Sequence, residues 1–256
     1  MNEWLVLLGK GLVAGLIVGF VTASIQSWVD RFFLVIILVG LVGLPIQQAV
    51  VVNLVVISLA ALMMLLRQTD VALSVRNHGP AVVIPAALGG ALGRVVALSV
   101  KPSVLVGILG VYAILAGLRL VLIRPLGERE NKGHPAWIGP IAALSGVLAG
   151  LLSAGGKPFT VPLYNNVLGH HPRRAYALAT VGVVSGAWMS LLTHIIVGET
   201  IARDRLLLAL YLFVVIVLTA LAVERIWTPK LNRIVTYIIA PILVLVGARF
   251  LWTVLA

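Results

Sequence analysis

The chain has 256 residues, of which 61% are hydrophobic and 11% are charged. This composition excludes a soluble domain and indicates a polytopic membrane protein. The net charge of +11 comes from 19 Lys and Arg against 8 Asp and Glu. In such a chain we assign the excess to cytoplasmic loops and anionic lipid headgroups, not to nucleic acid. The absence of cysteine excludes disulfides, thiolate metal sites and cysteine nucleophiles.

The first half of the chain contains apolar segments separated by short polar breaks. We expect a retained first helix over 4–25, because no cationic region with a small-residue cleavage site precedes it. A polar interruption at 26–31 follows, and then an apolar stretch at 32–43 that is too short to cross a membrane alone. Three spans are predicted after it, at 47–66, 80–100 and 103–123, with a polar loop at 67–79.

The second half repeats this order. A predicted helix at 136–154 runs into Gly155-Gly156-Lys157-Pro158, which is a poor sequence for continuing a helix. A short apolar stretch at 159–168 and three spans follow, at 172–197, 206–223 and 234–254. We therefore divide the chain into an N-terminal transmembrane repeat at 1–123, a cytoplasmic linker at 124–135 and a C-terminal transmembrane repeat at 136–256.

The two halves align as an internal duplication. The stretch that starts at Gly43 aligns with the one that starts at Gly169, and the same register places Arg31 opposite Lys157. Each half is a broken hairpin plus three spans, so the number of crossings per half is odd whether the hairpin re-enters or crosses fully. The predicted fold is therefore an all-α polytopic membrane protein of two inverted repeats, each a broken helical hairpin plus three transmembrane helices.

Basic residues gather on one side of the predicted topology, which we assign to the cytoplasm with both termini outside. That side receives Arg67, Arg76, Arg124, Arg129, Lys132, Arg173, Arg174, Arg225, Lys230 and Arg233, and the other side chiefly Lys101, Arg203 and Arg205.

The helix breaks are the candidate binding sites, because broken backbone at membrane depth is tolerated only against protein or a watery cavity. An ionisable residue there, such as Lys157, is a functional hypothesis by default. Backbone N–H groups at a break favour an anion, and nearby polar side chains can donate hydrogen bonds to it. The predicted substrate-binding residues are Ser24, Gln26, Arg31, Asn53, Ser153, Gly155, Gly156, Lys157, Thr160, Asn165 and Thr180.

Some of these residues also have simpler structural explanations. Lys157 could extend to an interface, Arg31 could pair with Asp30, and Asn53 or Thr180 could join helices. The glycine series are predicted to be packing faces: Gly11, Gly15 and Gly19, Gly89 and Gly93, and Gly146 and Gly150. Pairing or extension to a helix end explains Arg94, and a hydrogen-bonded interfacial histidine explains His194 better than a proton relay does.

The stretch from Ser145 to Thr180 resembles the TauE/SafE family of sulfite exporters, in the 4-toluene sulfonate uptake permease superfamily. It carries a small-residue helix, the Gly155-Gly156 break, Val161-Pro162-Leu163, the turn at Gly169, and then Ala175. The resemblance implies a secondary transporter of sulfite, organosulfonates or related anions in the bacterial inner membrane, with no cofactor. A homodimer is left open.

Two other classes of function compete with a transporter. Duplicated broken helices also build anion channels, and a structural membrane subunit fits the same composition. An intramembrane lipid enzyme is less well supported, because the carboxylates lie almost entirely in loops or at span ends and no HExxH motif occurs. We therefore expect no catalytic residue and no metal site.

Overall fold

The computed structural model describes residues 3–24, 32–67, 69–123, 133–197 and 199–255 of the chain. Within these ranges it contains eight helices that are long and apolar enough to cross a membrane. They are α1 (Glu3–Ser24), α3 (Ile46–Arg67), α4 (Thr69–Ser99), α5 (Pro102–Leu122), α6 (Ile138–Leu152, preceded by the 3-10 turn η2, Pro135–Trp137), α8 (Pro172–Ile196), α9 (Arg203–Glu224) and α10 (Pro229–Leu255). The predicted all-helical membrane fold is confirmed.

Two short segments form the second arms of the hairpins, and both change from an α-helix to a π-helical turn. In the first half α2 (Phe32–Ile37) continues into η1 (Leu38–Val42), and in the second half α7 (Lys157–Pro162) continues into η3 (Leu163–Val167). Each arm is followed by a glycine with positive φ, Gly43 at 83° and Gly169 at 69°. This conformation costs glycine little and most other residues more.

The two arms also share the same backbone hydrogen bonds at a spacing of 126 residues (169 minus 43). The N–H of Leu44 donates to Leu38 O at 2.9 Å, and the N–H of His170 donates to Tyr164 O at 3.1 Å. The predicted duplication register is therefore present in the local structure of both halves.

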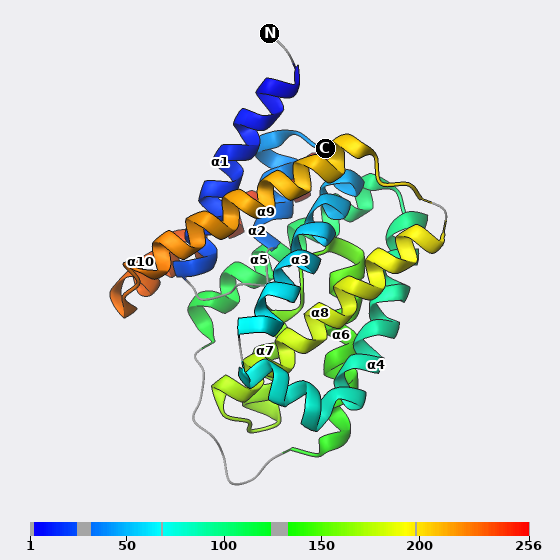
Figure 1. Cartoon of the computed structure of the whole chain (residues 1–256), viewed down its shortest axis with the longest axis vertical. Coiled ribbons are helices and arrows are strands. Elements are labelled where there is room, and N and C mark those ends of the chain that lie inside the picture. The colour runs from blue at the N-terminus through cyan, green and yellow to red at the C-terminus, as the bar shows by residue number, and fades with distance from the viewer. Residues whose placement is uncertain (1–2, 25–31, 68, 124–132, 198, 256) are drawn as a thin grey trace.

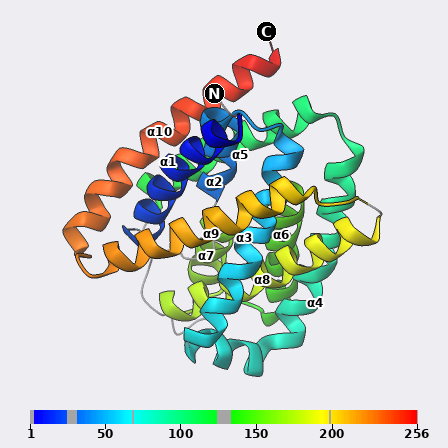
Figure 2. The same cartoon turned by 45° about the horizontal axis from the view of Figure 1, so that its top comes forward.

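The two halves pack against each other through reciprocal helix pairs, each pair with one helix from either half (Figures 1 and 2). The first helix of each half lies on the fourth helix of the other: α1 packs on α9, and α6 packs on α4. The last helices of the two halves, α5 and α10, pack on one another. The beginning of α1 and the end of α10 both lie in the upper part of both views.

Glycines form these interhelical contacts, as the sequence predicted. A Cβ at Gly15 of α1 would lie 2.6 Å from Val215 Cγ1 of α9, and one at Gly146 of α6 would overlap the Ala86 carbonyl of α4. Small residues let the backbones approach, which is the main way helices associate in lipid, where apolar side chains gain little by leaving the solvent.

The predicted loop at 67–79 is wrong, because the described residues from Thr69 onward belong to α4. This helix carries Pro80 and Pro85 inside it. A proline removes one N–H donor and obstructs the preceding turn, but helices in a membrane tolerate it where neighbouring helices, water or local adjustments satisfy the freed groups. The apolar part of α4 begins at Gly79, one residue before the predicted start.

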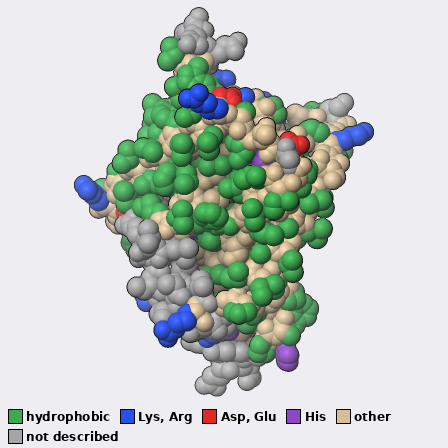
Figure 3. Space-filling view, turned by 45° about the vertical axis from the view of Figure 1, so that its right-hand side comes forward, with side chains coloured by type: hydrophobic (Ala, Val, Ile, Leu, Met, Phe, Trp, Pro, Cys, Tyr) green, Lys and Arg blue, Asp and Glu red, His purple; other side chains and the backbone are tan. Residues whose placement is uncertain are grey.

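Large apolar side chains cover the outer faces of the helices, as Figure 3 shows for one side of the molecule. Leu88 of α4 and Leu245 of α10, for example, are 64% and 70% exposed. Such a surface suits hydrocarbon as its solvent and would aggregate in water. The protein is therefore a multi-pass membrane protein.

Candidate functional site

The second hairpin breaks between α6 and α7, where the chain turns through Ser153 to Gly156. Ser153 ends α6 with φ of 47°, the one positive value at a non-glycine residue in the described ranges, and Gly155 also has φ of 47°. Gly156 then precedes α7, which begins at Lys157 with Pro158 next to it. A serine in this backbone conformation is costly, and such strain concentrates at functional sites.

Asn53 of α3 holds the first residue of the break. Its Nδ2 donates to Ser153 O at 2.8 Å and to Ser153 Oγ at 3.1 Å. Both residues are fully buried. The sequence assigned both to the binding site, and the structure brings them into direct contact.

Tyr112 of α5 holds the next two residues and connects the two hairpins. Its hydroxyl lies 2.8 Å from Ala154 O and 2.6 Å from Gly155 O, as a donor to both. Its ring makes edge contacts with Phe32 of α2 and Phe159 of α7, with centroids 5.5 and 5.2 Å apart. The second arms of the two hairpins therefore meet on one aromatic ring.

Lys157, the first residue of α7, is only 3% exposed. Its Nζ lies 4.1 Å from the centroid of the Tyr176 ring on α8 and has no hydrogen-bond partner. An ammonium that leaves water without hydrogen bonds loses several kcal/mol, and a cation–π contact returns about 2 kcal/mol when desolvated. The charge of Lys157 is thus only partly compensated by the protein.

Ser145 of α6 faces the same break and also has a buried hydroxyl without a partner. A Cβ added to Gly156 would lie 2.7 Å from Ser145 Cα and 3.1 Å from its Oγ. Gly156 is therefore required for α6 and the start of α7 to approach this closely. Thr160 donates its hydroxyl to Gly156 O at 3.0 Å and completes the first turn of α7.

The remaining predicted residues have other positions. Asn165 donates its amide to His170 O at 2.8 Å and closes the turn after the hairpin, and Thr180 donates to Tyr176 O within α8. Ser24 ends α1, with its carbonyl accepting from the Trp227 indole at 3.0 Å. Gln26 and Arg31 lie outside the described residues.

Three residues of this site were not predicted: Tyr112, Ser145 and Tyr176. Of these three, only Tyr112 could have been found from the sequence, because it is the single polar aromatic residue of the apolar span Pro102–Leu122.

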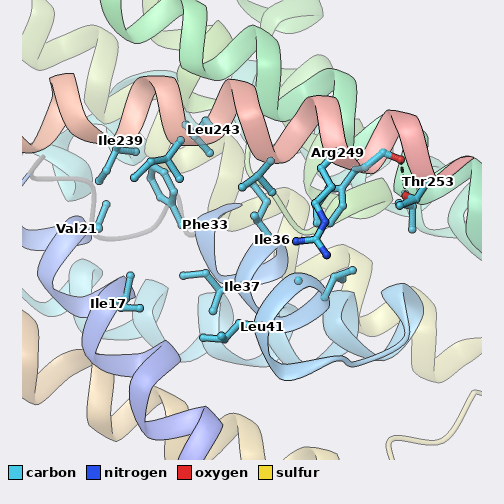
Figure 4. A pocket seen from close by; sticks show the side chains of 16 residues that line it. Ile17, Val21, Phe33, Ile36, Ile37, Leu41, Ile239, Leu243, Arg249 and Thr253 are labelled. Carbon is cyan, nitrogen blue, oxygen red and sulfur yellow. Dashed lines mark hydrogen bonds between the residues drawn. The ribbon is translucent and has the colours of Figure 1, made fainter.

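An apolar cavity of about 450 Å³ lies between α1, the first hairpin and α10 (Figure 4). Arg249 is the one ionisable side chain among its lining residues, and the hydroxyl of Thr253 there already donates to Phe250 O. A small oxyanion would find one cation and little else to bind it. In the described part of the chain, no group of three or more His, Asp or Glu residues could hold a metal ion.

Eight apolar helices, two hairpins with matching backbone turns and a polar break on a discontinuous helix define a polytopic membrane protein of the transporter type. Residues 7–250 match the family model described as sulfite exporter TauE/SafE. The chain belongs to this family, and the resemblance seen in its sequence is confirmed. Membership implies a membrane transporter of sulfur-containing anions such as sulfite. No curated protein and no solved structure matches the chain.

Proposed function

We propose that this protein is a secondary transporter that binds a small sulfur-containing oxyanion, sulfite or an organosulfonate, at the break between α6 and α7. The observation that supports the site is the buried ammonium of Lys157, which has no hydrogen-bond partner. The hydroxyl of Ser145 would be the second donor to the anion.

The carbonyl groups of the break repel an anion less than free carbonyls would, because they already accept hydrogen bonds from side chains. A helix C-terminus carries partial negative charge and would repel an anion. Here Asn53 donates to Ser153 O, and Tyr112 donates to Ala154 O and Gly155 O. These two side chains offset the carbonyl charge, while Lys157 and Ser145 keep their donors free for the substrate.

Binding requires the break to open. Ser153, Thr160 and Asn53 are fully buried, and Gly156 is in close contact with α6. An anion therefore enters only when α7 moves relative to α3, α5 or α8, which is the kind of rearrangement that exposes a central site alternately to each side.

The test is sulfite flux into proteoliposomes that contain the purified protein. A secondary transporter gives flux that saturates with sulfite and accumulates it against its own gradient when a driving ion gradient is imposed. Flux that never exceeds electrochemical equilibrium would indicate an anion channel, and no flux above protein-free vesicles would support a structural subunit.

A further inference from the structure

A second polar pocket, of about 480 Å³, lies at the ends of α4 and α8 and the beginnings of α3 and α9. Its lining differs from that of the apolar cavity, because polar and charged side chains predominate: Gln47, Gln48, Arg94, His194, Glu199, Thr200, Asp204 and Arg205. None of these residues takes part in the break between α6 and α7.

Arg94 forms the inner side of the pocket and is 1% exposed. Its Nη2 lies 2.9 Å from His194 Nδ1, and its Nε has no partner. A buried arginine inside a membrane span is expensive and marks a functional site by default. The corresponding position of the second half, 126 residues later, is the buried Ala220 (94 + 126). Arg94 is therefore not part of the duplicated framework.

The pair has a defined donor pattern. A guanidinium only donates hydrogen bonds, so Nδ1 of His194 must be the acceptor, and its proton sits on Nε2. Arg94 and His194 thus both offer N–H groups, and the planar guanidinium suits an oxyanion.

Helices that line the pocket also contact the break or the helix that carries it. A Cβ added at Gly150 of α6, three residues before Ser153, would lie 2.7 Å from the backbone N of Arg94. Val51 of α3 lines the pocket, two residues before Asn53, which binds Ser153. Neither Asn53 nor Ser153 lines the pocket, so the pocket and the break share helices but not lining residues.

Acidic groups occupy the exposed rim of the pocket. Asp204 pairs with Arg205 at 3.4 Å. The carboxylate of Glu199 is exposed in the segment between α8 and α9, and its charge acts on both Arg94 and His194. A bound anion would replace Glu199 as the negative charge that compensates Arg94.

We propose that this pocket is a second anion site, in which Arg94 and His194 bind a small oxyanion of the transported class before or after it occupies the break. The proposal rests on the proposed function for the class of ligand, but its residues are separate from those of the break.

The experiment is equilibrium titration of the purified protein in detergent with sulfite at constant ionic strength. The wild type is expected to bind two anions. Arg94→Gln loses one of them or weakens it by about 10- to 150-fold, the range for a hydrogen bond to a charged group. Glu199→Gln tightens the same site by about two- to fivefold, because a competing exposed charge is removed. Lys230→Gln, at an exposed cation that begins α10, leaves both sites unchanged.

The Lys157→Gln variant separates the two proposals. In that background the pocket alone is expected to bind sulfite, and Glu199→Gln still tightens it; this comparison decides the matter if Arg94→Gln does not fold. One bound anion that Lys157→Gln abolishes and Glu199→Gln leaves unaltered would overturn the pocket proposal and keep the proposed function. One bound anion that responds to Glu199→Gln and not to Lys157→Gln would support the pocket and overturn the site at the break.

Discussion

Gly146 of α6 shows how single residues set the distance between helices. A Cβ there would overlap the Ala86 carbonyl, which belongs to the backbone of α4 and cannot rotate away. The same helix carries the break at its end, so the packing of Gly146 also fixes where Ser153 and Lys157 lie.

We predict that Gly146→Ala destabilises the protein by about 1–3 kcal/mol, the usual effect of overpacking, because α6 and α4 must separate. Gly9→Ala is the matched control: it lies in α1 with no atom within 4 Å of the added Cβ. That change is expected to be neutral or to stabilise by about 0.5–1 kcal/mol, since alanine favours helix. Thermal unfolding in detergent measures both, and equal midpoints for the two variants would contradict the close contact.

At the residue scale, the sequence identified the groups whose chemistry is unusual for their surroundings. A lysine beside two glycines and an asparagine in an apolar span can be recognised from the sequence alone, and the structure places Lys157 and Asn53 at one break. Ser145 and Tyr176 could not be recognised, because serine and tyrosine are common in helices and their importance here depends on contacts across the fold. Asn165 was predicted from its polarity, but its amide closes a local turn.

At the scale of elements, α5 connects the two hairpins through Tyr112. The tyrosine contributes a ring to Phe32 and Phe159 and a hydroxyl to the carbonyls of the break. These two contributions can be separated by removing the hydroxyl alone.

We predict that Tyr112→Phe lowers the stability by about 1–2 kcal/mol, because a hydrogen bond in the membrane contributes about that much at most. It should also weaken sulfite binding at the break, since Ala154 O and Gly155 O then present uncompensated partial negative charge. Tyr237→Phe, at an exposed tyrosine of α10, is the control and should change neither quantity. Unfolding midpoints and sulfite titrations of both variants test this, and unaltered binding in Tyr112→Phe would show that the carbonyl charge does not matter.

The elements themselves were largely predictable, and their local irregularities were not. Long apolar runs gave the eight spans, because hydrophobic length is the dominant signal in a membrane. The π-helical turns at 38–42 and 163–167 leave no such signal, since they replace one backbone hydrogen-bond pattern by another in equally apolar sequence. The helical start of α4 was missed because polar residues before two prolines are typical of a loop.

At the scale of the whole molecule, the helices of the two halves pack on one another in a reciprocal pattern, and the opposite orientation of the two repeats stays a prediction. Each first helix packs on the fourth helix of the other half, and α5 packs on α10. A two-fold axis that relates the halves would produce this pattern. The distribution of charge predicts the orientation in the membrane, with both termini outside.

We predict that Lys230→Cys, at the start of α10, is shielded from a membrane-impermeant thiol reagent in intact cells, while Lys101→Cys, between α4 and α5, reacts. Both side chains are exposed, and the natural chain has no cysteine to interfere. Permeabilised cells provide the control, in which both variants should react. Labelling of Lys230→Cys from outside together with protection of Lys101→Cys would reverse the orientation.

Whether Lys157 binds the transported anion is measured most directly by the sulfite concentration at half-maximal flux in proteoliposomes. Lys157→Gln is compared with Lys101→Gln, which removes an exposed lysine at the beginning of α5. If Lys157 binds the anion, Lys157→Gln raises this concentration by about 10- to 150-fold or abolishes saturable flux, and Lys101→Gln leaves it unchanged. Wild-type flux and half-saturation in a folded, monodisperse Lys157→Gln protein would contradict it.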